Sequence, residues 1–105
     1  MKVKQVLTVA PAGLAEFCRQ KHIGRLALFG SVLRDSFRPD SDIDVLVEFE
    51  RGHVPGFIGL GTIEIELSRL FGDRKVDLHT PASLSEEFRS LVLSEAEVQF
   101  DAQRR

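Results

Sequence analysis

A window between residues 25 and 49 constrains the fold of this chain more than any other feature. Arg25–Phe29 is a short apolar run that predicts a buried strand, and it stops at Gly30. Ser31 follows and can cap a short helix that runs through Arg34. A strand, a glycine and a helix start together place backbone N–H groups where an anion can bind, and a side chain on the glycine would hold a phosphate away. The sequence therefore predicts a phosphate-binding turn.

The second half of the window alternates apolar and polar residues. Residues 42–49 have a period of two, the pattern of a strand with one face in the core. The apolar face carries Ile43, Val45, Val47 and Phe49. Asp42 and Asp44 lie on the opposite face, with Leu46 and Glu48. Because Mg²⁺ takes one or two carboxylates plus phosphate oxygens and water, both aspartates are candidate metal ligands beside the phosphate turn.

Each of these motifs alone is weak evidence. A Gly-Ser pair is most often a plain turn, and an Asp-x-Asp pair is usually a solvated strand edge or loop, because short motifs match often by chance. Here both lie within residues 30–45, joined by residues 36–41, which contain Pro, Asp and Ser as a surface connection should. The combination favours a phosphate- and metal-binding site over a plain turn and a solvated strand edge.

A third candidate carboxylate lies on a later strand. Residues 75–79 alternate again, with Asp77 on the polar face between Lys75 and His79. If this strand pairs beside residues 42–49, the three aspartates meet around a common point. Three carboxylates can hold two Mg²⁺ ions roughly 3.5–4 Å apart, and Asp77 would help deprotonate an attacking hydroxyl. The alternative is a surface aspartate that pairs with Lys75 or Arg74, and the sequence leaves both open.

These residues resemble the motif of the nucleotidyltransferase superfamily that includes DNA polymerase beta, specifically its small members, the minimal nucleotidyltransferases (MNT). That motif is Gly-Ser, two residues, Arg-Gly, a short loop and Ser-Asp-x-Asp, with a third acidic residue on a later strand. The matching residues are Gly30, Ser31, Arg34, Ser41, Asp42, Asp44 and Asp77. The resemblance extends from Leu14 to about Phe100, and Asp35 departs from it by standing where many members have glycine.

The resemblance implies a Mg²⁺-dependent enzyme that transfers AMP from ATP. It assigns nucleotide binding to Gly30, Ser31, Arg34 and Ser41, and both catalysis and the binding of two Mg²⁺ ions to Asp42, Asp44 and Asp77. Similar proteins are often paired with a helical HEPN ribonuclease toxin and act as its antitoxin by adding AMP to it, commonly on tyrosine. This chain contains no Tyr, so we expect a hydroxyl of a protein partner to be the acceptor.

Two other functions stay open. One is a binding antitoxin that covers its partner and has a vestigial nucleotide site, and the other is a small nucleotide-binding or sensory subunit of a larger assembly. The oligomeric state also stays open between a homodimer and a hetero-oligomer. The three aspartates favour the enzyme, because carboxylates that repel one another without metal are readily lost from a vestigial site. An exposed apolar stripe on the last helix, around Leu91 and Val92, is a candidate partner surface in every case.

The rest of the sequence predicts an α/β fold of the α+β type, in which helices cover the core face of a small mixed sheet of three to four strands. A single domain over residues 1–105 is expected from the length. The predicted helices are Pro11–His22, ended by Gly24; Phe57–Leu70, ended by Gly72; and a last helix capped by Ser83 or Ser85. Val98–Phe100 is predicted as a short edge strand.

Composition and single residues exclude several classes of protein. A net charge of −2 argues against direct binding of a nucleic-acid duplex, which needs many cationic contacts. Cys18 is the one cysteine and is expected in the core, which fits a reducing cytoplasm. His22, His53 and His79 lack metal-ligand spacing, so no zinc site is predicted. No long apolar stretch is present, so we expect a cytoplasmic protein without a signal peptide or membrane span.

Overall fold

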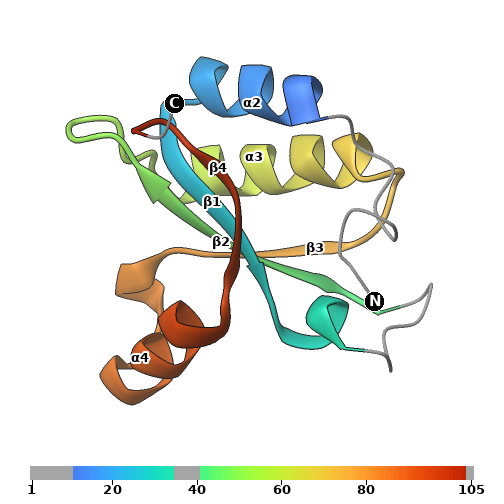
Figure 1. The fold of residues 1–105 in the computed structure, drawn as a ribbon. Helices are drawn as coiled ribbons and strands as arrows, with labels where there is room; N and C mark the ends of the chain where they lie inside the picture. The colour runs from blue at the N-terminus through green and yellow to red at the C-terminus, as the bar shows by residue number, and fades with distance from the viewer. Residues whose placement is uncertain (1–10, 35–40, 104–105) are drawn as a thin grey trace.

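Four strands form one mixed sheet in the computed structural model, which describes residues 11–34 and 41–103 (Figure 1). The main elements are α2 (Pro11–Gln20), β1 (Ile23–Phe29), β2 (Ile43–Phe49), α3 (Phe57–Leu70), β3 (Val76–His79), α4 (Glu86–Glu95) and β4 (Glu97–Asp101). Two 3₁₀ turns are η1 (Gly30–Leu33) and η2 (Pro81–Ser83). The strand order is β3-β2-β1-β4, with β1 antiparallel to both neighbours and β3 parallel to β2. The predicted α+β fold with a mixed sheet is confirmed.

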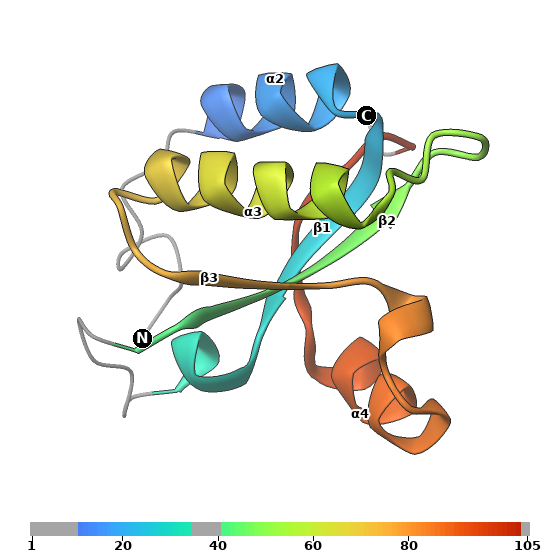
Figure 2. The same ribbon diagram turned by 180° about the vertical axis from the view of Figure 1, so that it is seen from behind.

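Helices α2 and α3 cover one face of the sheet (Figures 1 and 2). The core between these helices and the sheet consists of buried side chains that include Leu14, Cys18, Leu26, Leu28, Val45, Val47, Ile63 and Leu67. The alternation of apolar residues in β1 and β2 produces this core, because every second side chain of a strand points to the same face. Burial raises the pKa of the Cys18 thiol to about 12, so this cysteine is a packing residue, as predicted.

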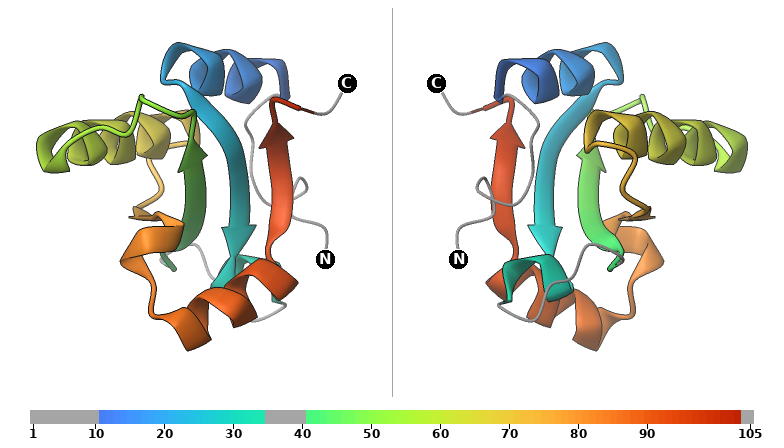
Figure 3. Two further views of the ribbon diagram at one scale, coloured as in Figure 1. Left: turned by 90° about the vertical axis from the view of Figure 1, so that its left-hand side faces the viewer. Right: turned by 90° about the vertical axis from the view of Figure 1, so that its right-hand side faces the viewer.

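The opposite face of the sheet has a smaller core of its own. Phe29 and Leu46 pack there against Leu84 and Val92, the latter from α4. The sequence placed Leu46 among polar residues on this face, but Leu46 is 2% exposed and belongs to this second core. The predicted exposed stripe was half right, because Val92 is buried while Leu91 is exposed. Figure 3 shows that α4 and η1 both lie at the end of the sheet where β1 finishes, and Figure 1 shows them apart from each other there.

The first helix ends earlier than predicted. Helix α2 stops at Gln20, and His22 then adopts a left-handed backbone conformation with φ 58°. This turn starts β1 at Ile23, so Gly24 lies inside the strand and does not end the helix.

The later elements agree more closely with the sequence. Helix α3 has the predicted bounds, and Gly72, with φ 75°, follows it. Ser85 caps α4 by accepting a hydrogen bond from the N–H of Phe88 at 3.3 Å, which decides between the two predicted caps. Of the connection predicted at residues 36–41, residues 36–40 lie outside the described residues, as does the departure at Asp35. Among the residues that are described, no helix has the length and apolar character needed to cross a membrane.

Candidate functional site

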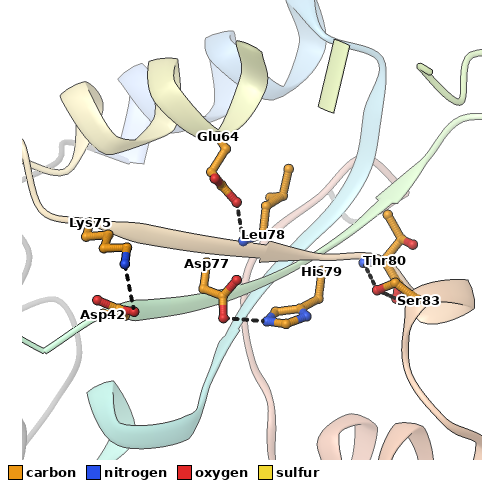
Figure 4. Close-up of polar contacts among 8 residues, drawn as sticks. All are labelled: Asp42, Glu64, Lys75, Asp77, Leu78, His79, Thr80 and Ser83. Carbon is orange, nitrogen blue, oxygen red and sulfur yellow. Dashed lines mark hydrogen bonds and ion pairs between the residues drawn. The ribbon is translucent and has the colours of Figure 1, made fainter. Parts of the chain in front are cut away.

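Asp44 and Asp77 face each other on neighbouring strands, on the side of the sheet that carries α4. Asp44 of β2 pairs in register with Asp77 of β3 and with Phe29 of β1. Together with His79, the two aspartates form a group whose ligand atoms all lie within 4.8 Å of one another. Figure 4 shows Asp77 and His79 pointing to the same side of β3, away from α3. The predicted pairing of the two acidic strands is therefore present.

His79 holds the Asp77 carboxylate in place. Its Nε2 lies 3.1 Å from Oδ2 of Asp77, and its ring makes an edge contact with Phe29 at 5.4 Å between centroids. The sequence placed His79 on the polar face of the strand but assigned it no role, because no metal-ligand spacing surrounds it. The available signal was its position two residues after Asp77, which puts both side chains on one face of β3.

Asp42 is outside this group, so the structure brings two of the three predicted aspartates together, with His79, and leaves Asp42 beside them. It precedes β2, and its Oδ2 is 3.8 Å from Nζ of Lys75 (Figure 4). The backbone N–H of Ile43 donates to the carbonyl of Lys75 at 2.8 Å, which fixes the two segments side by side. The Lys75 side chain is 79% exposed, so its ion pair with Asp42 is weak and easily exchanged for another partner of Asp42. Ser41, half-buried, directly precedes this aspartate.

Burial and neighbouring negative charges both disfavour the ionised form of Asp44. Burial raises the pKa of its carboxyl above the usual value, and the negative charges of Asp77 and Asp42 raise it further, while His79 acts in the opposite direction. A cation among these carboxylates would relieve both penalties. Carboxylate oxygens are also the donors that Mg²⁺ prefers, so the residues present fit this ion.

The predicted phosphate turn packs directly against the carboxylate of Asp44. Gly30 has φ 77°, and a Cβ placed on it would lie 2.2 Å from Oδ2 of Asp44. Glycine is therefore required here for two reasons, the left-handed backbone and the contact with the acidic group. The sequence had given a different reason, room for a phosphate.

The helix expected from Ser31 to Arg34 is a 3₁₀ turn shifted by one residue. It begins at Gly30, so Phe29 takes the N-cap position and no side chain caps the turn, contrary to the prediction for Ser31. It ends at Leu33, and the exposed Arg34 has an extended backbone whose N–H donates to the carbonyl of Ser31 at 3.0 Å. The shift follows from the left-handed glycine, which turns the chain immediately after β1.

Glu64 is a positioning residue that the sequence did not indicate. Its carboxylate on α3 accepts a hydrogen bond from the backbone N–H of Leu78 at 2.9 Å (Figure 4). This bond ties β3, at the edge of the sheet, to α3, and so fixes the strand that carries Asp77 and His79. The contact joins residues fourteen positions apart, and no local pattern signals it.

Comparisons with known proteins agree with this geometry. The sequence model of the nucleotidyltransferase domain family matches residues 12–101. The protein adenylyltransferase MntA of Thermococcus cleftensis is 34% identical over 94 residues, which cover 90% of this chain and 89% of that protein. A solved structure assigned as a minimal nucleotidyltransferase has a TM-score of 0.71 at 30% identity, covering 91% of this chain and 94% of the other.

A further solved structure shares the fold. It contains the tri-AMPylated HEPN toxin of Shewanella oneidensis in complex with an MNT antitoxin. The matching chain has a TM-score of 0.63 at 21% identity, and the match covers 89% of this chain and 71% of that one.

Proposed function

Because this chain belongs to the nucleotidyltransferase domain family, we propose that it is a Mg²⁺-dependent enzyme that transfers AMP from ATP to a hydroxyl of a protein partner. The observation that carries the proposal is the position of Asp44, in register with Asp77 and in contact with the Gly30 turn. The similarity to a protein adenylyltransferase supports AMP as the transferred group and a protein as the acceptor.

The partner that we propose is a HEPN toxin, with this chain as its antitoxin. The fold shared with the MNT antitoxin in the toxin complex supports this assignment. The chain contains no Tyr, so AMP transfer to tyrosine would have to occur on another protein. Helix α4 also presents Phe88, Leu91 and Leu93 to solvent, an apolar surface that a partner can cover. ATP as the donor and the free thiol of Cys18 fit a cytoplasmic protein.

Asp42, Asp44 and Asp77 are the residues that would hold two Mg²⁺ ions. When bound, Mg²⁺ supplies positive charge that offsets the charge on the phosphate oxygens during transfer. Burial and the repulsion from Asp77 and Asp42 together raise the pKa of Asp44, and this supports the role, since a cation would offset both effects. The weak ion pair between Asp42 and Lys75 leaves the Asp42 carboxylate available.

The transfer is an in-line displacement at the α-phosphorus of ATP. The hydroxyl oxygen of the partner forms a bond to this phosphorus, the bond from phosphorus to the α,β-bridging oxygen breaks, and pyrophosphate leaves. Asp77 accepts the hydroxyl proton, and His79 orients the accepting carboxylate at 3.1 Å. Ser31, Arg34 and Ser41 contact the phosphates, while Gly30 keeps a side chain out of the contact with Asp44.

Parallel reactions with α-³²P-ATP and γ-³²P-ATP test the proposal. Each contains Mg²⁺, the purified chain and the HEPN protein encoded nearest to it, or a lysate of its host. We expect label on the partner from the α position only, and loss of that label in Asp44→Asn. The matched control is Asp73→Asn, which removes an exposed carboxylate from a left-handed position that asparagine also adopts.

The other outcome is equally informative. No label from either position, with the partner still co-purifying equally with wild type and Asp44→Asn, would show a binding antitoxin and overturn the enzymatic proposal. Equal labelling by wild type and Asp44→Asn would instead overturn the role of the aspartates.

A further inference from the structure

A second group of metal-ligating side chains lies at the other end of β1 and β2. His22 immediately precedes β1, and Glu50 immediately follows β2. The antiparallel register pairs Ile23 with Phe49, so the residues on either side of that pair also meet. His53 follows in the loop after β2, and one ligand atom from each of the three lies within 4.8 Å of the other two.

The backbone already holds these residues together. The N–H of Glu50 donates to the carbonyl of His22 at 2.8 Å, and the N–H of His53 donates to the carbonyl of Glu50 at 3.0 Å. The two imidazole rings stack with 3.8 Å between centroids and 12° between planes. The main chain fixes the backbone positions of all three residues, so a ligand has only their side chains to order.

His22 also adopts an uncommon backbone conformation. Its φ of 58° lies in the left-handed region, which few residues other than glycine occupy. This conformation ends α2 and brings the His22 side chain beside Glu50, with 3.3 Å between Nδ1 and Oε1. The turn therefore directs an imidazole onto a carboxylate at the cost of some backbone strain.

We propose that His22, Glu50 and His53 bind a Zn²⁺ ion. Two imidazoles and one carboxylate, with a fourth position open to water, are a ligand set that zinc takes in proteins. Two ligands of a tetrahedral zinc with bonds of 2.0–2.1 Å lie roughly 3.3–3.4 Å apart, close to the separation of Nδ1 and Oε1. The imidazoles favour zinc over Mg²⁺, which takes oxygen ligands.

The side chains have the freedom to close around the ion. All three residues are exposed, so one imidazole can turn out of the stack and direct a ring nitrogen at the ion without meeting a packing barrier. The bound ion would join the turn between α2 and β1 to the loop between β2 and α3. This site is separate from the aspartates at the far end of the strands, and it does not depend on AMP transfer.

Titration of the tag-free chain with ZnCl₂ tests this site. The chain has three histidines, so the ¹H–¹⁵N correlations of their imidazoles can be assigned with the variants His22→Ala, His53→Ala and His79→Ala. We expect Zn²⁺ to shift the His22 and His53 imidazoles. Loss of either ligand should weaken the affinity measured by calorimetry by at least about tenfold, since even outer-shell changes cost roughly 10–100-fold.

His79→Ala is the matched control, because His79 belongs to the other group of possible metal ligands. This variant should keep the binding event that His22 and His53 report. Circular dichroism establishes that each variant is folded. The zinc-induced imidazole shifts of the wild-type chain test the site even if a variant fails to fold. Affinity unchanged by both His22→Ala and His53→Ala, or zinc shifts confined to His79, would overturn the proposal.

Discussion

Gly30→Ala should destabilise the chain more than its backbone conformation alone requires. A residue other than glycine in the left-handed region costs roughly 1–2 kcal/mol. The new Cβ would also lie 2.2 Å from Oδ2 of Asp44, and overpacking of this kind costs typically about 1–3 kcal/mol. We therefore expect a loss of about 2–5 kcal/mol in the free energy of unfolding.

Gly52→Ala is the matched control for this variant. Gly52 has φ 82°, and a Cβ there meets nothing within 4 Å, so only the cost of the backbone conformation, about 1–2 kcal/mol, applies. Urea denaturation of both variants measures the difference. For a chain of this size, each kcal/mol corresponds to roughly 4–8 °C in the melting temperature.

A double-mutant cycle with Asp44→Ala isolates the contact. Alanine at position 44 removes the carboxylate and leaves the Asp44 Cβ, which lies at an ordinary 3.5 Å from the new methyl group. In this background Gly30→Ala should cost no more than Gly52→Ala, giving a coupling of about 1–3 kcal/mol. Equal costs for Gly30→Ala in the wild-type and Asp44→Ala backgrounds would refute the contact between turn and carboxylate.

Substitutions at three positions test the surroundings of the site. Asp44→Asn should be more stable than wild type at pH 7 without Mg²⁺, because the folded state raises the pKa of the Asp44 carboxyl from 3.8. The stability of the wild type should therefore fall as pH rises above 3.8. Urea titrations should show the stability difference between Asp44→Asn and wild type narrowing toward pH 4. Glu64→Ala should cost about 1–3 kcal/mol by leaving the Leu78 N–H without its acceptor, while Glu64→Gln, which keeps an acceptor oxygen, should cost less in the same assay. Leu46→Ala should cost about 2–5 kcal/mol and weaken protection of α4 in hydrogen exchange, since Leu46 fills the smaller core beneath that helix; unchanged exchange would contradict this.

Local periodicity was enough to predict most of the fold. The alternation at residues 42–49 and the apolar stripe of Phe57–Leu70 each depend on neighbouring residues alone, and both elements lie where they were expected. The burial of Leu46 could not be predicted, because its cover, α4, arrives from forty residues further along the chain. The helix predicted to Arg34 failed for a local reason, the left-handed turn at Gly30.

The same distinction applies to the two groups of polar residues. The proximity of Asp44 and Asp77 could be predicted from sequence because each lies on a recognisable strand. Parallel pairing of the two strands then places the aspartates in register. His22 and Glu50 lie just outside the strands β1 and β2, and their meeting depends on the register of Ile23 with Phe49. The spacing of His22 and Glu50 along the sequence therefore does not predict that they meet.

The acidic site itself argues for catalysis over binding alone. Asp44 is partly buried beside Asp77 and Asp42, and its raised pKa means that the ionised carboxylate lowers the stability of the folded chain at neutral pH. A chain that only covered a partner through α4 would be more stable with asparagine at position 44, and its binding would not change. A nucleotidyltransferase, in contrast, needs the charge to hold Mg²⁺, as active sites commonly sacrifice stability for function. Asp44→Asn therefore separates the two functions in one protein: an enzyme should gain stability and lose AMP transfer, whereas a binding antitoxin should gain stability and lose nothing.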